Sequence, residues 1–404
     1  MSRSSMTYQK KHKNRQLIIW GLLITIPAIL MLLMESRVMG EIGHQTYDAR
    51  LYLSVADNFI KTGHFIQTDR SVEGMVVPPG TPFMLTVFRL LHFSNRMIMY
   101  IQVFMFGMCN ILLYETEKRI NGIGIWAPIM YTMANLRCWI ILGDAIVEHY
   151  YLFLMCLGIW VMYKEITAEK KLLSMNVIGL AMLMFRPILA VVYVTILGYS
   201  LYWVIKNRKP GIGTIILLAP VLILGLNTAV NYRETGELIV LENYSGSDMY
   251  VASRADAPVM IEDAQKHIDE TYRTILNDDS RTMQQRNRLF KDLAKENRRH
   301  HFGLYLLNAI RRGNEIFLKA YAWATIYTLI GGIMLARSEQ KEGKLRSTGI
   351  LLVTLLLAVI SSFGVSEVRY SIVIWPMASI HGAFLTHLLL RVLFVKQHRK
   401  KLQK

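Results

Sequence analysis

The sequence predicts an all-α polytopic membrane protein with about ten transmembrane helices. Of its 404 residues, 53% are hydrophobic and only 19% are charged, whereas about a quarter are charged in an average soluble protein. Long apolar runs recur along the chain. The first, Leu17–Met34, holds 18 residues without a charge, which is enough to cross about 30 Å of hydrocarbon. Basic residues gather in the short segments between these runs.

The net charge of +17 is explained by membrane topology and not by binding to nucleic acid. Of the 46 Lys and Arg residues, 23 lie in short loops and tails at 1–16, 115–121, 164–171, 206–209, 336–346 and 391–404. Cytoplasmic loops carry such an excess of basic residues. We therefore expect a multi-pass protein of the plasma membrane with both termini in the cytoplasm. No small-residue cleavage site follows the first apolar run, so we interpret it as a span and not as a signal peptide.

The predicted spans follow one another through the whole chain. They lie at roughly 17–34, 97–115, 123–142, 145–163, 172–187, 188–205, 212–230, 314–335, 348–365 and 370–390. The apolar segment 172–205 would form one helix of about 51 Å, which is too long for a single crossing. Both of its flanks are basic, so the chain must turn back in the middle. Arg186-Pro187 is the expected turning point, because a residue before Pro avoids helical geometry.

The first outer segment, 35–96, is predicted to hold two amphipathic helices. Apolar residues recur at helical spacing in Ala49–Lys61 and again in Phe83–Phe93, after the Pro-rich run at 78–82. The second helix is too short to span comfortably, and a crossing there would invert every later loop and break the charge rule. We therefore expect both helices to lie at the membrane interface.

The second outer segment, 231–313, separates a core at 1–230 from C-terminal spans and a basic tail at 314–404. It is predicted to be mixed, with a β-like run at 238–241, a Gly/Ser turn at 245–247 and a basic amphipathic helix at about Thr282–His300. It carries 13 Lys or Arg residues. That charge is typical of a helix that lies on anionic lipid. It also fits attraction of a phosphate-bearing lipid substrate, and the two readings are compatible.

Four separate turns bring ionisable residues to the outer side in this topology. These are Asp48, Asp144 with Glu148, Arg186, and Glu367 with Arg369 and Tyr370. Charges beside the apolar region are costly and tend to mark functional sites. Each also has a structural explanation: Asp48 as a helix cap, Asp144 and Glu148 as anchors of a tight turn, and Arg369-Tyr370 as an interfacial anchor. Arg186 has two comparable roles, contact with a phosphate or with an acidic loop.

These residue types together suit transfer of a sugar from a lipid phosphate. A carboxylate such as Asp48 can take a proton from an acceptor hydroxyl. Guanidinium groups such as Arg186 and Arg369 can bind the departing phosphate through two parallel hydrogen bonds. They would stabilise it as negative charge builds up. Asp144 and Glu148 are four residues apart and share one helix face, where they could orient the acceptor.

The ordered pattern resembles the GT-C superfamily of membrane glycosyltransferases, nearly throughout the chain. The resemblance is to the branch of dolichyl-phosphate-mannose–protein mannosyltransferases and lipid A aminoarabinose transferases. Asp48 and Tyr52 match the acidic first outer loop, although Ala49 stands where a second acid often lies. The runs 56–63 and 78–82 are similar to the family's Gly-terminated helix and its Pro-Pro motif. Further similarities are the acids at 144 and 148, Phe185-Arg186-Pro187, the 231–236 segment and Val368-Arg369-Tyr370.

The resemblance implies an inverting transferase with a polyprenyl-phosphate sugar donor, undecaprenyl phosphate in a bacterium. Asp48 would be the general base, and Arg369, Arg186 and Tyr370 would bind the donor phosphate. Asp144, Glu148 and Tyr52 would position a glycan, lipid or protein acceptor. The active site would face the extracytoplasmic side. No metal or cofactor is expected, because the mannosyltransferase branch does not need one.

Two other functions fit part of the pattern. A cell-envelope polysaccharide polymerase or ligase would share the lipid donor and often carries Arg and His in a late outer loop, as in Arg298-Arg299-His300-His301. Such an enzyme has less need of the Asp48 acid. A lipid or solute transporter would place ionisable residues at the membrane midplane and show internal repeats. No repeat is visible in this sequence.

Overall fold

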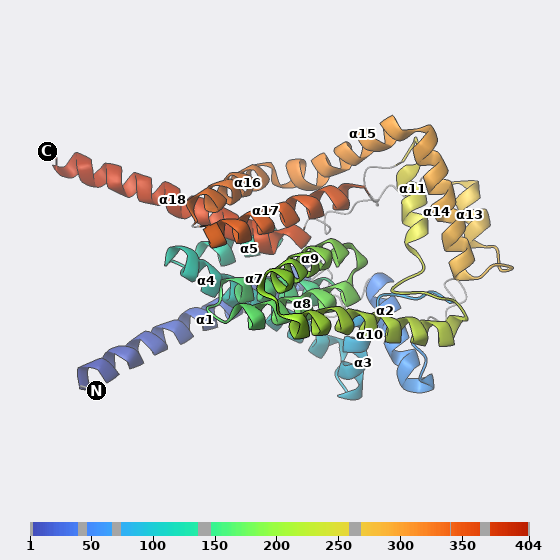
Figure 1. The fold of residues 1–404 in the computed structure, drawn as a ribbon, viewed down its shortest axis with the longest axis horizontal. Helices are drawn as coiled ribbons and strands as arrows, with labels where there is room; N and C mark the ends of the chain where they lie inside the picture. Colours follow the sequence, from blue (N-terminus) through green and yellow to red (C-terminus); the bar gives the residue numbers. More distant parts are fainter. Residues whose placement is uncertain are drawn as a thin grey trace.

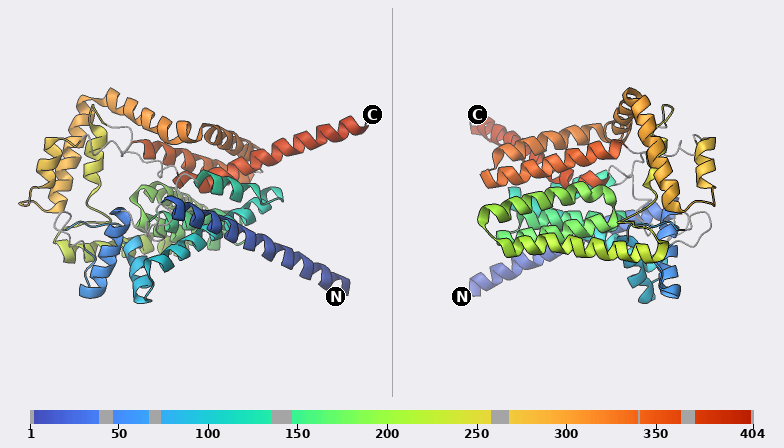
Figure 2. Two further views of the ribbon diagram at one scale, coloured as in Figure 1. Left: turned by 180° about the vertical axis from the view of Figure 1, so that it is seen from behind. Right: turned by 45° about the vertical axis from the view of Figure 1, so that its right-hand side comes forward.

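The computed structural model describes residues 3–38, 47–66, 74–135, 147–257, 268–339, 341–363 and 372–402. Throughout this described part the chain is helical or connecting, without a β-strand, so the predicted all-α class is confirmed. The helices form two groups, a bundle of long helices and a layer of shorter ones at one end of it (Figure 1). Both termini project from the opposite end of the bundle (Figure 2).

Within the part of the chain that the structure describes, the bundle helices follow the order of the apolar runs. They are α1 (Arg3–Val38), α4 (Asn95–Asn121), α5 (Trp126–Asn135), α7 (Glu148–Tyr163), α8 (Ala168–Phe185), α9 (Ala190–Asn207), α10 (Pro210–Thr235), α16 (Ala320–Ser338), α17 (Lys341–Ser362) and α18 (Trp375–Leu402). Their contacts bury a large apolar core that includes Leu113, Tyr131, Tyr151 and Trp375. These four residues come from α4, α5, α7 and α18, so the centre of the bundle joins the two halves of the chain.

Four segments of the described part are long and apolar enough to cross a membrane. They are Asn95–Asn121, Pro187–Asn207, Pro210–Thr235 and Ile372–Leu393, and two shorter apolar stretches lie at Asn14–Leu30 and Arg346–Ser362. The chain therefore has the character of a membrane protein. The count of ten crossings and their direction stay predictions.

The predicted reversal at Arg186-Pro187 is confirmed. Helix α8 ends at Phe185, a single 3-10 turn, η3 (Pro187–Leu189), follows, and α9 begins at Ala190. The two helices pack against each other in antiparallel directions. Asn176 of α8 donates a hydrogen bond of 2.7 Å to Ser200 of α9. Gly179 faces Tyr193 so closely that an added Cβ would lie 3.0 Å from its ring.

The layer at the other end of the bundle consists of short helices. They are α2 (Tyr47–Thr62), α3 (Gly80–Leu90), α11 (Ser245–Ser253), α13 (Glu270–Leu276), α14 (Met283–His300) and α15 (Phe302–Gly313). We call these six helices the outer layer (Figure 1). The two predicted amphipathic stretches of the first outer segment correspond to α2 and α3. Helix α15 continues through a π-helical turn, η5 (Asn314–Lys319), into α16.

The β-like run 238–241 is not a strand. Its carbonyl groups accept hydrogen bonds from side chains of α10 and not from a neighbouring strand: Asn231 donates to Ile239 at 2.8 Å, and Asn227 donates to Val240. Leu238 and Val240 are exposed, whereas Ile239 is buried. The alternation of apolar side chains is therefore real, but the backbone has no strand partner within the described part of the chain.

The basic helix forms over Met283–His300, as predicted. Its apolar face packs on protein, whereas the sequence suggested a helix that lies on anionic lipid. Thr282 and Gln285 form a reciprocal capping box at its start. Its apolar residues Phe290 and Ala294 are buried against Tyr250 of α11. This face packs on protein, so it is not free to lie on lipid.

Candidate functional site

Arg186 is fixed at the turn between α8 and α9. The following Pro187 excludes helical geometry at Arg186, which has φ −149° and ψ 118° and ends the helix. The Arg186 guanidinium donates to the Glu148 carboxylate at 2.6 Å. Its Cζ lies 5.9 Å from the centre of the Tyr151 ring. The Glu148 side chain is 1% accessible, and that of Arg186 is 22% accessible.

The Pro-Pro-Gly run joins the first outer segment to this turn. Gly80 begins α3 against the end of α8, where an added Cβ would lie 2.8 Å from the Phe185 ring and 2.9 Å from the Met184 carbonyl oxygen. Only glycine fits so close an approach. On its other side Phe185 stacks on Tyr150 of α7, with ring centres 5.3 Å apart. The contact fixes α3 relative to Arg186.

One face of helix α2 packs against Tyr150 of α7 and Phe185 of α8. Ala49, Leu53 and Ala56 are buried in a cluster that also contains Tyr150, with Tyr52 and Phe185 packed against it. Asp48 lies one turn before Tyr52 on the same helical face and is half-buried. The packing of α2 thus carries Asp48 and Tyr52 to the α7–α8 end of the bundle.

Tyr244 connects this region to the second outer segment. Burial raises the pKa of Tyr244 well above its usual value, the neighbouring Tyr52 and Glu242 raise it further, and Arg186 lowers it. Tyr244 also packs in one apolar cluster with Tyr52. Because Tyr244 packs with Tyr52, the second outer segment meets the first outer segment here, within electrostatic reach of Arg186 at the α8–α9 turn. We call Asp48, Tyr52, Glu148, Arg186 and Tyr244 the outer cluster.

Asn243 holds the two outer segments together just before Tyr244. Its side chain accepts a hydrogen bond from the Val76 N–H at 2.8 Å and donates one to the Gly74 carbonyl at 2.9 Å. Its own N–H donates to the Val76 carbonyl at 3.3 Å. Asn243 is 1% exposed. Three hydrogen bonds to one short backbone stretch give this residue a specific structural role.

A second contact joins the ends of α2 and α10. The buried Glu234 carboxylate lies 2.5 Å from His64 Nδ1 and also accepts from Arg233. Arg233 in turn donates to the carbonyl of Gly63, the residue that follows α2. The C-terminal end of α2 is therefore tied to the end of α10.

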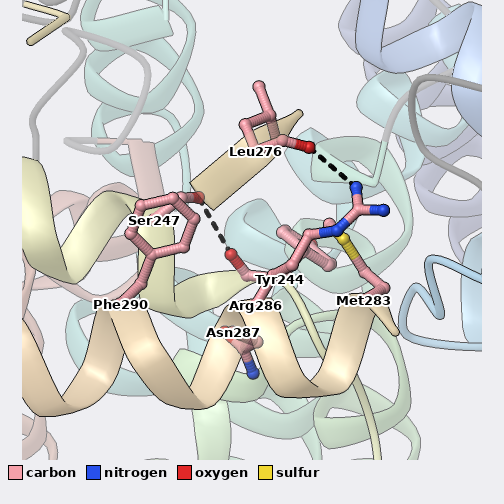
Figure 3. A pocket seen from close by; sticks show the side chains of 7 residues that line it. All are labelled: Tyr244, Ser247, Leu276, Met283, Arg286, Asn287 and Phe290. Atoms are coloured by element: carbon pink, nitrogen blue, oxygen red, sulfur yellow. Dashed lines mark hydrogen bonds between the residues drawn. The ribbon is translucent and has the colours of Figure 1, made fainter. Parts of the chain in front are cut away.

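A small pocket lies between α11, α13 and α14 (Figure 3). Its lining is Tyr244, Ser247, Leu276, Met283, Arg286, Asn287 and Phe290. Arg286 donates to the Leu276 carbonyl at 2.8 Å, and Ser247 donates to the Tyr244 carbonyl at 3.0 Å. Arg286 thus joins α14 to α13, whereas the Ser247 bond is local to the start of α11. Tyr244 belongs both to the lining of this pocket and to the outer cluster.

The structure brings four of the predicted site residues to one end of the bundle. These are Asp48, Tyr52, Glu148 and Arg186. Asp144, Arg369 and Tyr370 lie outside the described residues. The sequence left two possible contacts for Arg186, a phosphate or an acidic loop. The structure shows a contact of the second kind, between Arg186 and Glu148. Among the residues that the structure describes, no three His, Cys, Asp or Glu side chains are grouped so that they could hold a metal ion.

Sequence reasoning missed Asn243, Tyr244 and the His64–Glu234 contact. The only signal for the first two is their place directly before the Gly/Ser turn at 245–247, which marks a change of direction without naming a partner. The side chain of Asn243 bonds to residues that are 167 and 169 positions away in the sequence. Such contacts follow from the packing of helices and not from a local pattern.

No protein-family model matches this chain, and no curated protein sequence matches it either.

Proposed function

We propose that this protein is a membrane glycosyltransferase that moves a sugar from a polyprenyl-phosphate donor to an acceptor at the outer-layer end of the bundle. The observation that carries the proposal is the packing of α2 on the end of the bundle that holds Arg186. Helix α2 bears Asp48 and Tyr52 and is buried against Tyr150, and Phe185, the neighbour of Arg186, packs on the same cluster. Tyr244 of the second outer segment packs with Tyr52. A carboxylate, two phenols and a cation thus gather where the spans meet the polar layer.

In the proposed reaction, Asp48 takes the proton from an acceptor hydroxyl. The acceptor oxygen then attacks the anomeric carbon of the sugar from the face opposite the phosphate. The bond between this carbon and the phosphate oxygen breaks, its electron pair leaves with the polyprenyl phosphate, and the configuration inverts. The Arg186 guanidinium stabilises the charge that builds on the phosphate. Arg369 and Tyr370 are proposed to share this task.

The geometry refines the role of Glu148. Its carboxylate is 1% accessible and 2.6 Å from Arg186, so we assign it to orienting the guanidinium. A fixed cation avoids the cost of reorganisation during the reaction. Positioning of the acceptor then falls to Tyr52 and Asp144. The acceptor is a glycan, a lipid or a protein.

A lipid-linked donor suits the surface of the adjacent helices. Helix α10 exposes apolar side chains along much of its length, among them Leu222, Leu226 and Val230. Such a surface is compatible with the bilayer and with a prenyl chain. The proposed location is the plasma membrane, with the outer layer on the extracytoplasmic side.

The test is consumption of radiolabelled undecaprenyl-phosphate sugars by membranes that carry the full-length protein. Wild type is expected to transfer or hydrolyse the label from at least one donor of the panel. Asp48→Asn is expected to lower that rate about 100-fold or more, the range for loss of a general base. Asp57→Asn is the matched control on α2: Asp57 pairs with Arg89 at 3.3 Å and is 44% accessible, so its loss should leave most activity.

Equal rates in wild type and Asp48→Asn would refute the role of Asp48. A panel in which no donor is consumed would count against the transferase and favour the transporter. Label that accumulates in a long polymer would instead indicate a polysaccharide polymerase or ligase.

A further inference from the structure

Helix α15 carries an exposed apolar face at the corner of the outer layer. Phe302 is 63% exposed and Ile310 is 62% exposed. Leu304, Leu306 and Leu307 are 45%, 40% and 41% exposed. Phe302, Leu306 and Ile310 are four residues apart and form one stripe on the helix. Five large apolar side chains in a 12-residue helix are therefore left open.

The opposite face of α15 is fixed by contacts with protein. Tyr305, Asn308, Ala309 and Arg312 are buried. The fully buried Arg312 donates to the Ala252 carbonyl at 3.1 Å, near the end of α11. The Tyr305 hydroxyl donates to the Phe363 carbonyl at 3.4 Å, just after α17. Because these two contacts fix the orientation of α15 about its helix axis, the apolar stripe faces away from the protein.

Positive charge borders this stripe. Arg299, His300 and His301 are exposed at the end of α14, and Arg311 is exposed near the end of α15. No Asp or Glu occurs from residue 297 to residue 314. A surface that combines apolar and basic side chains is complementary to the headgroups and upper acyl chains of anionic lipids.

We propose that α15 inserts its apolar stripe into the anionic lipid surface of the membrane that the bundle crosses. Continuity supports this occupant: α15 leads through η5 directly into α16, which exposes Ile326 and Ile330 among the bundle helices (Figure 1). A second copy of the chain fits less well. A symmetric contact between two copies would bring one basic corner against the other, and like charges repel.

The lipid contact would fix the position of the outer layer. Arg312 ties α15 to the end of α11, and α11 begins beside Tyr244 of the outer cluster. Lipid at α15 therefore holds the second outer segment over the ends of α7 and α8. This inference does not depend on the proposed enzymatic function.

The experiment uses spin labels on the full-length protein in lipid nanodiscs. Cys109, Cys138 and Cys156 are first replaced by Ala, and single cysteines are then placed at Phe302, Ile310 and Gln285. Gln285 is an exposed position at the far end of α14 and serves as the matched control. Collision with oxygen, which prefers lipid, is compared with collision with a water-soluble nickel chelate.

Labels at 302 and 310 are expected to favour oxygen in nanodiscs with phosphatidylglycerol, whereas the label at 285 favours the nickel chelate. Replacing phosphatidylglycerol by phosphatidylcholine should reduce the preference for oxygen at 302 and leave 285 unchanged. Nickel accessibility at 302 and 310 equal to that at 285 would overturn the proposal. Dipolar broadening at 302 that disappears on dilution with unlabelled protein would overturn it in favour of a second copy.

Discussion

Replacing Asn243 by Ala should detach the first outer segment from the second. The substitution removes the side-chain oxygen that accepts a hydrogen bond from the Val76 N–H. Val76 is only 2% exposed, so water cannot replace that oxygen. A buried donor left without a partner costs about 1–3 kcal/mol. The half-buried Gly74 carbonyl loses a second hydrogen bond, worth about 1 kcal/mol because water can replace it in part. The expected loss of local stability is about 2–4 kcal/mol.

The assay is amide hydrogen exchange of the protein in nanodiscs, followed by mass spectrometry. At 1.36 kcal/mol for each factor of ten, exchange at residues 75–77 should accelerate about 30- to 900-fold. Amides of α4 serve as an internal reference, because a local opening leaves them unchanged.

Asn227→Ala is the matched control for this prediction. Asn227 donates to the Val240 carbonyl in the same outer segment, where Val240 is 51% exposed and water can replace the bond. Its loss should cost less than about 1 kcal/mol. Exchange at 75–77 that is unchanged in Asn243→Ala would refute the reasoning, as would equal acceleration in both variants.

Three further predictions concern the same region. Arg186→Met should destabilise the protein by about 2–4 kcal/mol, because it leaves the buried Glu148 carboxylate without its cation. Thermal unfolding in detergent would measure this loss, and adding Glu148→Gln to the variant should recover part of it. Gly246→Ala should cost about 1–3 kcal/mol, since its Cβ would meet the Asn287 carbonyl oxygen, whereas Gly303→Ala, with nothing within 4 Å, should be close to neutral; equal melting temperatures would contradict this. Burial, followed by the hydrogen bond to Asp269, raises the pKa of Tyr250 from 10.0 to about 12. The unfolded chain therefore loses this proton first, and the free energy of unfolding should fall as the pH rises from about 10 to 12. The fall should be smaller in Tyr250→Phe, and identical pH profiles of unfolding in the two proteins would exclude the contribution.

Local patterns were sufficient for most of the helices. Apolar runs of helical length predicted the bundle helices in order, and Arg186-Pro187 predicted the reversal between α8 and α9, because Pro187 constrains the residue before it regardless of the fold. Helical periodicity located α2, α3 and α14. The same reasoning failed at 238–241, where alternating apolar residues indicate a strand only if another strand lies alongside. The side chains of Asn227 and Asn231 take that place.

The sequence by itself determined the class of this protein, its helices and the side chains capable of chemistry at their ends. Only the tertiary structure decided which of these meet. It paired Glu148 with Arg186, turned the apolar face of α14 onto α11 and left that of α15 exposed. It also packed Tyr244 with Tyr52. The physical reason is range: helix propensity and proline geometry act within a few residues, whereas these contacts join groups that are distant in the sequence and depend on how whole helices pack.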